Sequence, residues 1–80
     1  MTDSNRVKIE VAHYAIDDFR LKTYHHSFPG TGFRFLGPDG RWASCIGDGQ
    51  RFSSKDAAKR TARRLEKELT AEDIFKKLGF

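Results

Sequence analysis

Cysteine is nearly absent from this chain, since Cys45 is the only one among 80 residues. A single thiol cannot form an internal disulfide or a zinc site of several cysteines, so we expect a reducing compartment. No run approaches the roughly 20 apolar residues that a membrane span needs. Residues 1–5 lack the apolar core and the positive cluster of a signal peptide. These absences predict a soluble, cytoplasmic protein with no membrane partner.

The chain is also short, which leaves room for one small domain. With 38% hydrophobic and 12% aromatic residues, its composition is that of a folded protein rather than a disordered one. A domain of this size buries only about 60% of the surface that its unfolded chain exposes. We therefore expect a flexible N-terminus over residues 1–5 and a single α+β domain over residues 6–80, as a monomer or a homodimer.

Acidic residues are scarce in one part of the chain, between residues 51 and 64. Residues 1–50 contain six basic and six acidic residues, whereas residues 51–64 contain six Lys or Arg against Asp56. The formal net charge of +4 therefore arises in the last third of the sequence. This asymmetry predicts an anionic partner, although a high pI can also serve solubility.

Turn residues and alternating apolar residues predict a β-meander. Apolar side chains recur at every second position over residues 7–11 and 19–23, around a polar turn at Asp17 and Asp18. A helix over residues 12–22 is the alternative, because the apolar residues there also fit helical spacing. Further strands are expected over residues 33–36, 41–46 and 50–52. Pro-Gly-Thr-Gly at 29–32, Gly-Pro-Asp-Gly at 37–40 and Asp-Gly at 48–49 are the turns that separate them. We assign Phe33, Phe35 and Phe52 to the core, and favour burial for Trp42.

Two helices are predicted after the strands. Ser53 or Ser54 opens the first, with Asp56 in the position of a capping-box acid. The next apolar residues are three or four positions apart and form a narrow stripe on one face of a helix: Ala58, Ala62, Leu65 and Leu69. Residues 70–73 (Thr-Ala-Glu-Asp) resemble a second cap, followed by a short amphipathic helix that Gly79 terminates. The expected fold class is α+β: an antiparallel β-meander of four to five strands followed by one long and one short C-terminal helix.

Basic residues lie opposite the apolar stripe of the long helix and span about 140° of the helical wheel. Such a row can contact several phosphates and release their counterions. With two flanking cations, the predicted nucleic-acid contacts are Arg51, Lys55, Lys59, Arg60, Arg63, Arg64 and Lys67. The alternative is a solvated helix face, with Glu66 and Glu68 as partial partners. Trp42, Arg34 and Arg41 interleave aromatic and guanidinium groups on the sheet and are possible further contacts.

Catalytic chemistry is weakly represented. His13, His25 and His26 lack the helical spacing of a metal site, and a lone strand cysteine such as Cys45 is usually a small core residue. Neither a phosphate-binding loop nor a serine-nucleophile elbow is present. We therefore expect no enzyme activity, no cofactor and no bound metal.

Residues 40–46 (Gly-Arg-Trp-Ala-Ser-Cys-Ile) and 52–58 (Phe-Ser-Ser-Lys-Asp-Ala-Ala) resemble DNA-binding domains made of a three-stranded sheet and a helix. These are the AP2 type of plants and the arm-binding domains of phage integrases. There, a Gly-basic-Trp strand precedes an aromatic residue, a polar turn and an Ala-Ala helix start. The resemblance covers about residues 33–69. It implies a sheet laid in the major groove, with Arg34, Arg41 and Trp42 as contacts.

Two looser resemblances concern the same region. Residues 47–49 and 53–59 are similar to the last hairpin and helix start of double-stranded RNA-binding domains, where helix N-terminal lysines grip phosphates. Lys55 occupies one of those lysine positions, while Ser54 and Ala58 occupy the other two. The strand-turn-strand and Ala-rich helix pattern also resembles small YegP-like domains.

These observations predict a small phage or bacterial nucleic-acid-binding protein that contacts phosphates through a basic helix face, with DNA favoured over RNA. The alternative is a protein-binding inhibitor, for example a phage-encoded anti-CRISPR-type or anti-host factor. It would dock on an acidic or nucleic-acid-binding groove of a host protein. A third reading is a dimer-forming role, in which Ile74, Phe75, Leu78 and Phe80 provide an apolar edge.

Overall fold

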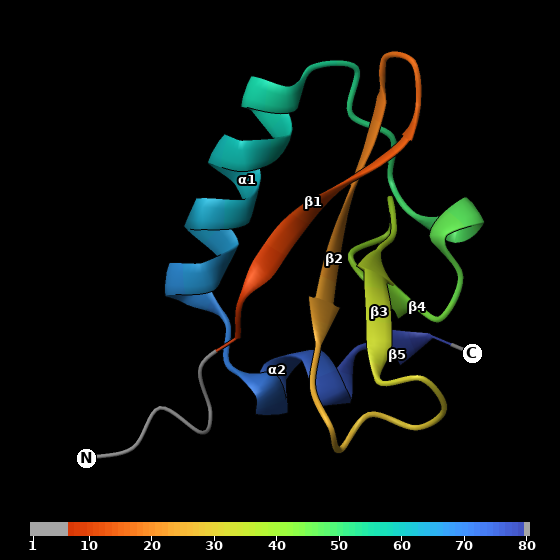
Figure 1. Cartoon of the computed structure of the whole chain (residues 1–80). Helices are drawn as coiled ribbons and strands as arrows, with labels where there is room; N and C mark the ends of the chain where they lie inside the picture. Colours follow the sequence, from red (N-terminus) through yellow and green to blue (C-terminus); the bar gives the residue numbers. More distant parts are fainter. Residues whose placement is uncertain (1–6, 80) are drawn as a thin grey trace.

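Two long strands form the centre of the fold. The computed structural model describes residues 7–79, and in it β1 (Ile9–Ala15) pairs antiparallel with β2 (Asp18–Tyr24) (Figure 1). The turn between them includes Asp17, whose φ of 58° is a left-handed conformation that Asp tolerates. The predicted hairpin is thus confirmed. The alternative helix over residues 12–22 does not form, because residues 9–15 and 18–23 pair as antiparallel strands. The apolar core-facing residues Phe19 and Leu21 are two positions apart, as in a strand.

The sheet has five strands in the order β1-β2-β3-β4-β5. β3 (Phe33–Leu36) and β4 (Trp42–Ala43) extend the antiparallel sheet, as the meander prediction requires. β5 (Leu78–Gly79) pairs with β4 in parallel and returns the chain to the sheet edge. The sequence pattern indicated only a helix stop at Gly79. The fold class is α+β, with four antiparallel strands followed by a long and a short helix.

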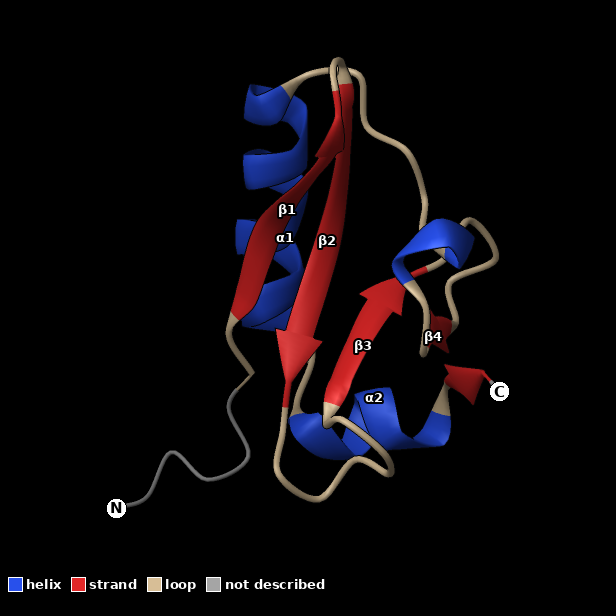
Figure 2. Cartoon of the chain, turned by 45° about the vertical axis from the view of Figure 1, so that its right-hand side comes forward, coloured by secondary structure: helices blue, strands red, loops and turns tan. Residues whose placement is uncertain are grey.

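The predicted hairpin at residues 48–49 is wrong. The strand expected over residues 41–46 stops at Ala43, and a 3-10 helix η1 (Ile46–Asp48) follows, seen in Figure 2 beside β3. Gly49 has a φ of −79°, not the positive value that the predicted turn requires. The Arg20 guanidinium binds carbonyls of this segment and draws it across the sheet. Residues 50–52 then form no named strand, although Phe52 makes a β-bridge with Phe19.

Both helices begin at capping residues. In α1 (Lys55–Glu68) the Ser54 hydroxyl accepts a hydrogen bond from the Ala57 N–H at 3.4 Å. The capping role predicted for Asp56 is therefore wrong, since the third helical position belongs to Ala57. In α2 (Ala71–Lys76) Thr70 and Asp73 form the predicted cap as a full capping box.

The core lies between the sheet and the two helices, with α1 alongside β1 and β2 and α2 across the lower end of the strands (Figure 1). The predicted stripe packs inward: Ala58 and Ala62 are buried, and two leucines pack against the core. Small residues let the helix backbone approach the sheet closely. Trp42 is 1% exposed, so the prediction of burial is confirmed.

The side chains of β3 that face the core are not the ones predicted. Arg34 pairs with buried Thr23 and faces the helices, whereas Phe33 pairs with exposed Tyr24 and faces outward. Phe33 is 38% exposed and Phe35 is half-buried, so neither is a core residue as predicted. Phe52 is half-buried and packs against the core. The register with β2 decides which side chains face the core, because a one-residue shift reverses every side chain.

The C-terminal apolar edge is largely used within the fold. Ile74 is fully buried and Leu78 packs against the core, which contradicts their assignment to a docking edge. Phe75 is exposed but contacts Phe28 edge-on, with ring centroids 5.4 Å apart. Phe80 and the predicted flexible residues 1–5 lie outside the described residues. Within residues 7–79, neither helix has the length and apolar character needed to cross a membrane.

Candidate functional site

The candidate site is the basic helix face, which we define as Lys59, Arg60, Arg63, Arg64 and Lys67 of α1. All five side chains are exposed, and they point away from the buried stripe of the same helix. Within residues 7–79, none of them hydrogen-bonds or ion-pairs with another side chain or with the backbone of another element. The five positions span about 12 Å of helix axis. The structure thus brings these predicted contacts together on one surface.

The spacing of these cations opposes helix stability. Lys55, Lys59, Arg63 and Lys67 follow one another at intervals of four residues, and so do Arg60 and Arg64. Like charges at this spacing destabilise a helix by about 0.2–0.5 kcal/mol for each pair. A surface helix that served only solubility would gain stability from interspersed acids. Two opposite-charge pairs also occur at this spacing, Asp56 with Arg60 and Arg64 with Glu68, so the four like-charge pairs outnumber the attractive ones. The arrangement therefore concentrates positive charge on one face of α1.

The surface between these side chains is concave. Asp56, Lys59, Arg60 and Arg63 line an open hollow of about 480 Å³ on the outer side of α1. Three cations around one hollow suit an anionic group, such as a phosphate, that can approach several of them at once. The carboxylate of Asp56, at the N-terminal end of the hollow, partly offsets the positive charge of these three cations.

The two flanking cations lie near the N-terminus of α1. Lys55 is exposed at the first helical position. Arg51 is exposed, and its Nε donates to the Asp17 carbonyl of the β1–β2 turn at 3.4 Å. Both lie at the end of the molecule where the β1–β2 turn and the start of α1 meet (Figure 1). Lys55 continues the four-residue spacing of Lys59, Arg63 and Lys67, whereas Arg51 precedes the helix. Both can extend the basic helix face.

Two of the three predicted sheet contacts are buried. Trp42 belongs to the core, and Arg34 is 3% exposed, donating to the carbonyls of Phe33 and Pro29 at 2.7 and 3.0 Å. Neither side chain can reach a ligand on the sheet surface, because their positions face the helices. Arg41 is exposed beside the 37–40 turn and is available for contact.

The outward face of the sheet carries an aromatic pair, one member of which, Phe33, was predicted to lie in the core. Tyr24 and Phe33 are cross-strand neighbours, exposed by 53% and 38%, with ring centroids 5.0 Å apart. The Lys22 Nζ lies 5.3 Å from the Phe33 ring. The alternation of residues 33–36 indicates a strand, but it fits equally well with Phe33 facing the core or facing outward. Exposed aromatic pairs are typical of interaction surfaces.

A charged cluster of Arg20 and Asp18 lies on the outward face of the sheet, next to η1. Arg20 is 8% exposed and forms a bidentate pair with Asp18, both bonds being 2.8 Å. Its Nη1 donates to the carbonyls of Ile46, Gly47 and Gly49. The Arg20 Cζ lies 4.6 Å from the centroid of the Tyr14 ring, which packs over the guanidinium. The hydrogen bond from Arg20 lowers the pKa of Asp18, and the same bond raises the pKa of Arg20. All three guanidinium nitrogens of Arg20 thus donate to protein groups, which indicates a structural role for this cluster.

Histidine and cysteine side chains are dispersed. The rings of His25 and His26 stack with centroids 4.5 Å apart in the loop after β2, while His13 stacks on Phe19 in the hairpin. Cys45 is exposed beside η1 rather than in the core as predicted. Among residues 7–79, no three His, Cys, Asp or Glu side chains are grouped so as to hold a metal ion.

Comparisons with protein-family models, with curated proteins and with solved structures find no match for the chain. Function is therefore inferred from the surface chemistry described above.

Proposed function

We propose that the protein binds nucleic acid through the phosphate backbone, using the basic helix face. The observation that carries this proposal is a row of five exposed cations, none of which forms an ion pair with another described residue. Nucleic acid is the cytoplasmic polyanion whose regularly spaced charges match such a row. Each phosphate that a Lys or Arg neutralises releases counterions, which provides most of the free energy of non-specific binding.

The proposed contact is with the backbone rather than with base edges. Arg60, Arg63 and Arg64 can reach phosphate oxygens in bidentate geometry, and Lys59 and Lys67 add point charges on either side. Arg51 and Lys55 would extend the contact when the ligand continues past the N-terminus of α1. Phosphate contacts position a protein on its ligand and carry no sequence information. The expected binding is therefore strongly dependent on salt and weakly dependent on sequence, with DNA favoured over RNA.

Fluorescence anisotropy with labelled double-stranded DNA, double-stranded RNA and single strands tests the proposal. At three salt concentrations, log affinity should fall linearly with log salt, with a slope that reports several released counterions. Reversing Arg60, Arg63 and Arg64 to Glu should abolish binding. Binding that survives this triple reversal would place the contact elsewhere. Arg41 and the outward face of the sheet, which the resemblance to sheet-reading DNA-binding domains implies, would then be the next candidates.

One observation favours a second function, a protein-binding inhibitor. The exposed pair of Tyr24 and Phe33 with Lys22 beside it offers aromatic area of the kind that anchors protein interfaces. A partner with an acidic or nucleic-acid-binding groove could engage this face or the basic helix face. This function predicts tight binding to one host protein and little affinity for free nucleic acid. A pull-down that loses its partner on Phe33→Ser, but not on Arg63→Glu, would support it over the first proposal.

A further inference from the structure

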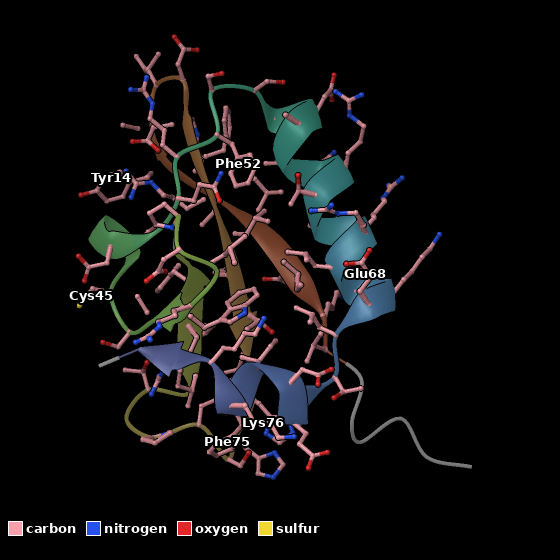
Figure 3. The ribbon with its side chains drawn as sticks, turned by 180° about the vertical axis from the view of Figure 1, so that it is seen from behind. Tyr14, Cys45, Phe52, Glu68, Phe75 and Lys76 are labelled. Carbon is pink, nitrogen blue, oxygen red and sulfur yellow. The ribbon has the colours of Figure 1, made fainter. Side chains whose placement is uncertain are left out.

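A second hollow lies on the helix side of the sheet, between α1, α2 and the 37–40 turn. Its volume is about 410 Å³, within the range that holds small ligands. Apolar residues from four parts of the chain line it: Leu36, Trp42, Phe52, Leu65 and Leu69. Figure 3 looks at this side of the molecule, with Phe52 above α2 and Glu68 on the facing side of α1. The lining suits a flat apolar group rather than an ion.

Polar side chains surround this apolar lining. Arg64 and Lys77 provide cations from α1 and from the end of α2, and Gln50 and Thr61 provide an amide and a hydroxyl. Glu68 and Asp73 add carboxylates. Asp73 is engaged by the Thr70 cap, whose backbone N–H and hydroxyl donate to it and lower its pKa. The two cations and two carboxylates of the lining balance in formal charge, so the hollow suits a flat ring with hydrogen-bonding edges, and Arg64 at its border can contact an attached phosphate. A nucleotide combines these features.

The hollow is continuous with the basic helix face through Arg64. This residue belongs to the row of cations and also lines the hollow, and it lies one turn after Arg60 on the same side of α1. Thr61 and Leu65 line the hollow from the adjoining side of the helix. A strand whose phosphate contacts Arg60 and Arg64 would thus bring its next base to the mouth of the hollow.

We propose that this hollow receives one unpaired base of a single-stranded nucleic acid whose phosphates lie on the basic helix face. The proposal rests on the function proposed above and adds a preference for single strands. A base within a duplex is stacked and paired, and it would have to be flipped out at a cost of a few kcal/mol. An unpaired base enters without that cost and gains contact with the half-buried apolar side chains of the lining, Phe52, Leu65 and Leu69.

The test compares two single-stranded DNA oligomers of equal length, one of thymidines and one with abasic sites in place of every thymidine. Both carry the same phosphates, so only the first can place a base in the hollow. We expect the abasic strand to bind about tenfold more weakly, which is within the range that one stacked base contributes. Trp42 is the only tryptophan and lies buried beside the hollow. A base seated in the hollow changes the surroundings of this indole, so its emission should change with the thymidine strand and not with the abasic one.

A variant that fills the hollow provides the second arm. Thr61→Tyr adds a ring from α1 without altering any charge, and it keeps Trp42 as the only tryptophan. It should bind thymidine and abasic strands equally, at the affinity of the wild type for the abasic strand. Ile16→Tyr places a tyrosine at the exposed β1–β2 turn, outside the lining of the hollow, and should behave as the wild type.

The outcomes separate the two proposals. Equal, salt-dependent binding of both strands by the wild-type protein would overturn the base-binding hollow and leave the basic helix face as the site. No binding of either strand at low salt would overturn both. A thymidine preference that persists in Thr61→Tyr would place the base elsewhere, and the Tyr24 and Phe33 pair would be the next surface to test.

Discussion

Arg63→Glu is the substitution that most clearly separates function from stability in this protein. Arg63 lies in the middle of α1, exposed, with Lys59 one turn before it and Lys67 one turn after it. Arg and Glu have similar helix propensities, so the change acts almost entirely through charge. We expect the variant to bind nucleic acid less tightly and to be more stable.

The stability gain follows from the pairs with Lys59 and Lys67, four residues away on either side. Arg60 and Glu66, three residues away, carry opposite charges, so their contributions to the change largely cancel. In the wild type each of the pairs with Lys59 and Lys67 is a like-charge pair that costs about 0.2–0.5 kcal/mol, and in the variant each becomes an attractive pair worth a similar amount. Removing two repulsions and adding two attractions gives about 1 kcal/mol. For a domain of this size that corresponds to about 4–8 °C in Tm. Salt at about 1 M should remove most of the gain, because it screens exposed charges.

The binding loss follows from the same charge. Losing one phosphate contact reduces the slope of log affinity against log salt by about 1, and the added carboxylate repels the ligand further. Thermal unfolding by circular dichroism and anisotropy titration on the same preparation measure both quantities. Because the variant is expected to be the more stable protein, unfolding cannot explain a loss of affinity.

Arg41→Glu is the matched control, since it makes the same change in net charge at an exposed residue outside α1. It should leave affinity nearly unchanged if the helix is the site. Unchanged affinity in Arg63→Glu together with a loss in Arg41→Glu would refute the helix assignment in favour of the sheet. A lower Tm for Arg63→Glu would refute the reasoning about spacing.

Three further predictions concern the fold. The Arg20 hydrogen bond lowers the pKa of Asp18 in the folded protein, so the unfolded chain binds a proton there more readily. The free energy of unfolding should therefore fall as the pH drops below about 4. Asp18→Asn should weaken this pH dependence, measured by urea unfolding at a series of pH values. Arg20→Met should cost about 2–3 kcal/mol, since it leaves the carbonyls of residues 46–49 without their charged donor, and should speed hydrogen exchange there. Thr70→Ala should cost about 1 kcal/mol in chemical denaturation by removing the capping box of α2, and Thr70→Ser should restore it.

The local elements were predictable because their signals lie within a few residues. The hairpin of β1 and β2 follows from alternation around a polar turn, and α1 follows from its serine cap and apolar stripe. The basic helix face was predictable for the same reason, since helical geometry fixes which side chains share a surface once one face is buried. What those cations bind stays a prediction.

The errors arose where distant residues decide the conformation. Arg20 donates hydrogen bonds to the carbonyls of Ile46 and Gly49, in and just after the 3-10 helix η1, from 26 and 29 positions away along the chain. The register with β2 sends Phe33 outward and Arg34 inward, a choice that the alternation of β3 leaves open. The hollow beside Trp42 exists only because α1, α2 and the 37–40 turn meet there. The sequence by itself determined the helices, the first hairpin and the charge of α1, because these depend on neighbours in the chain. Tertiary structure decided which side chains of β3 face the core, the path of residues 44–52 and the hollow, because these depend on contacts between segments that no local pattern records.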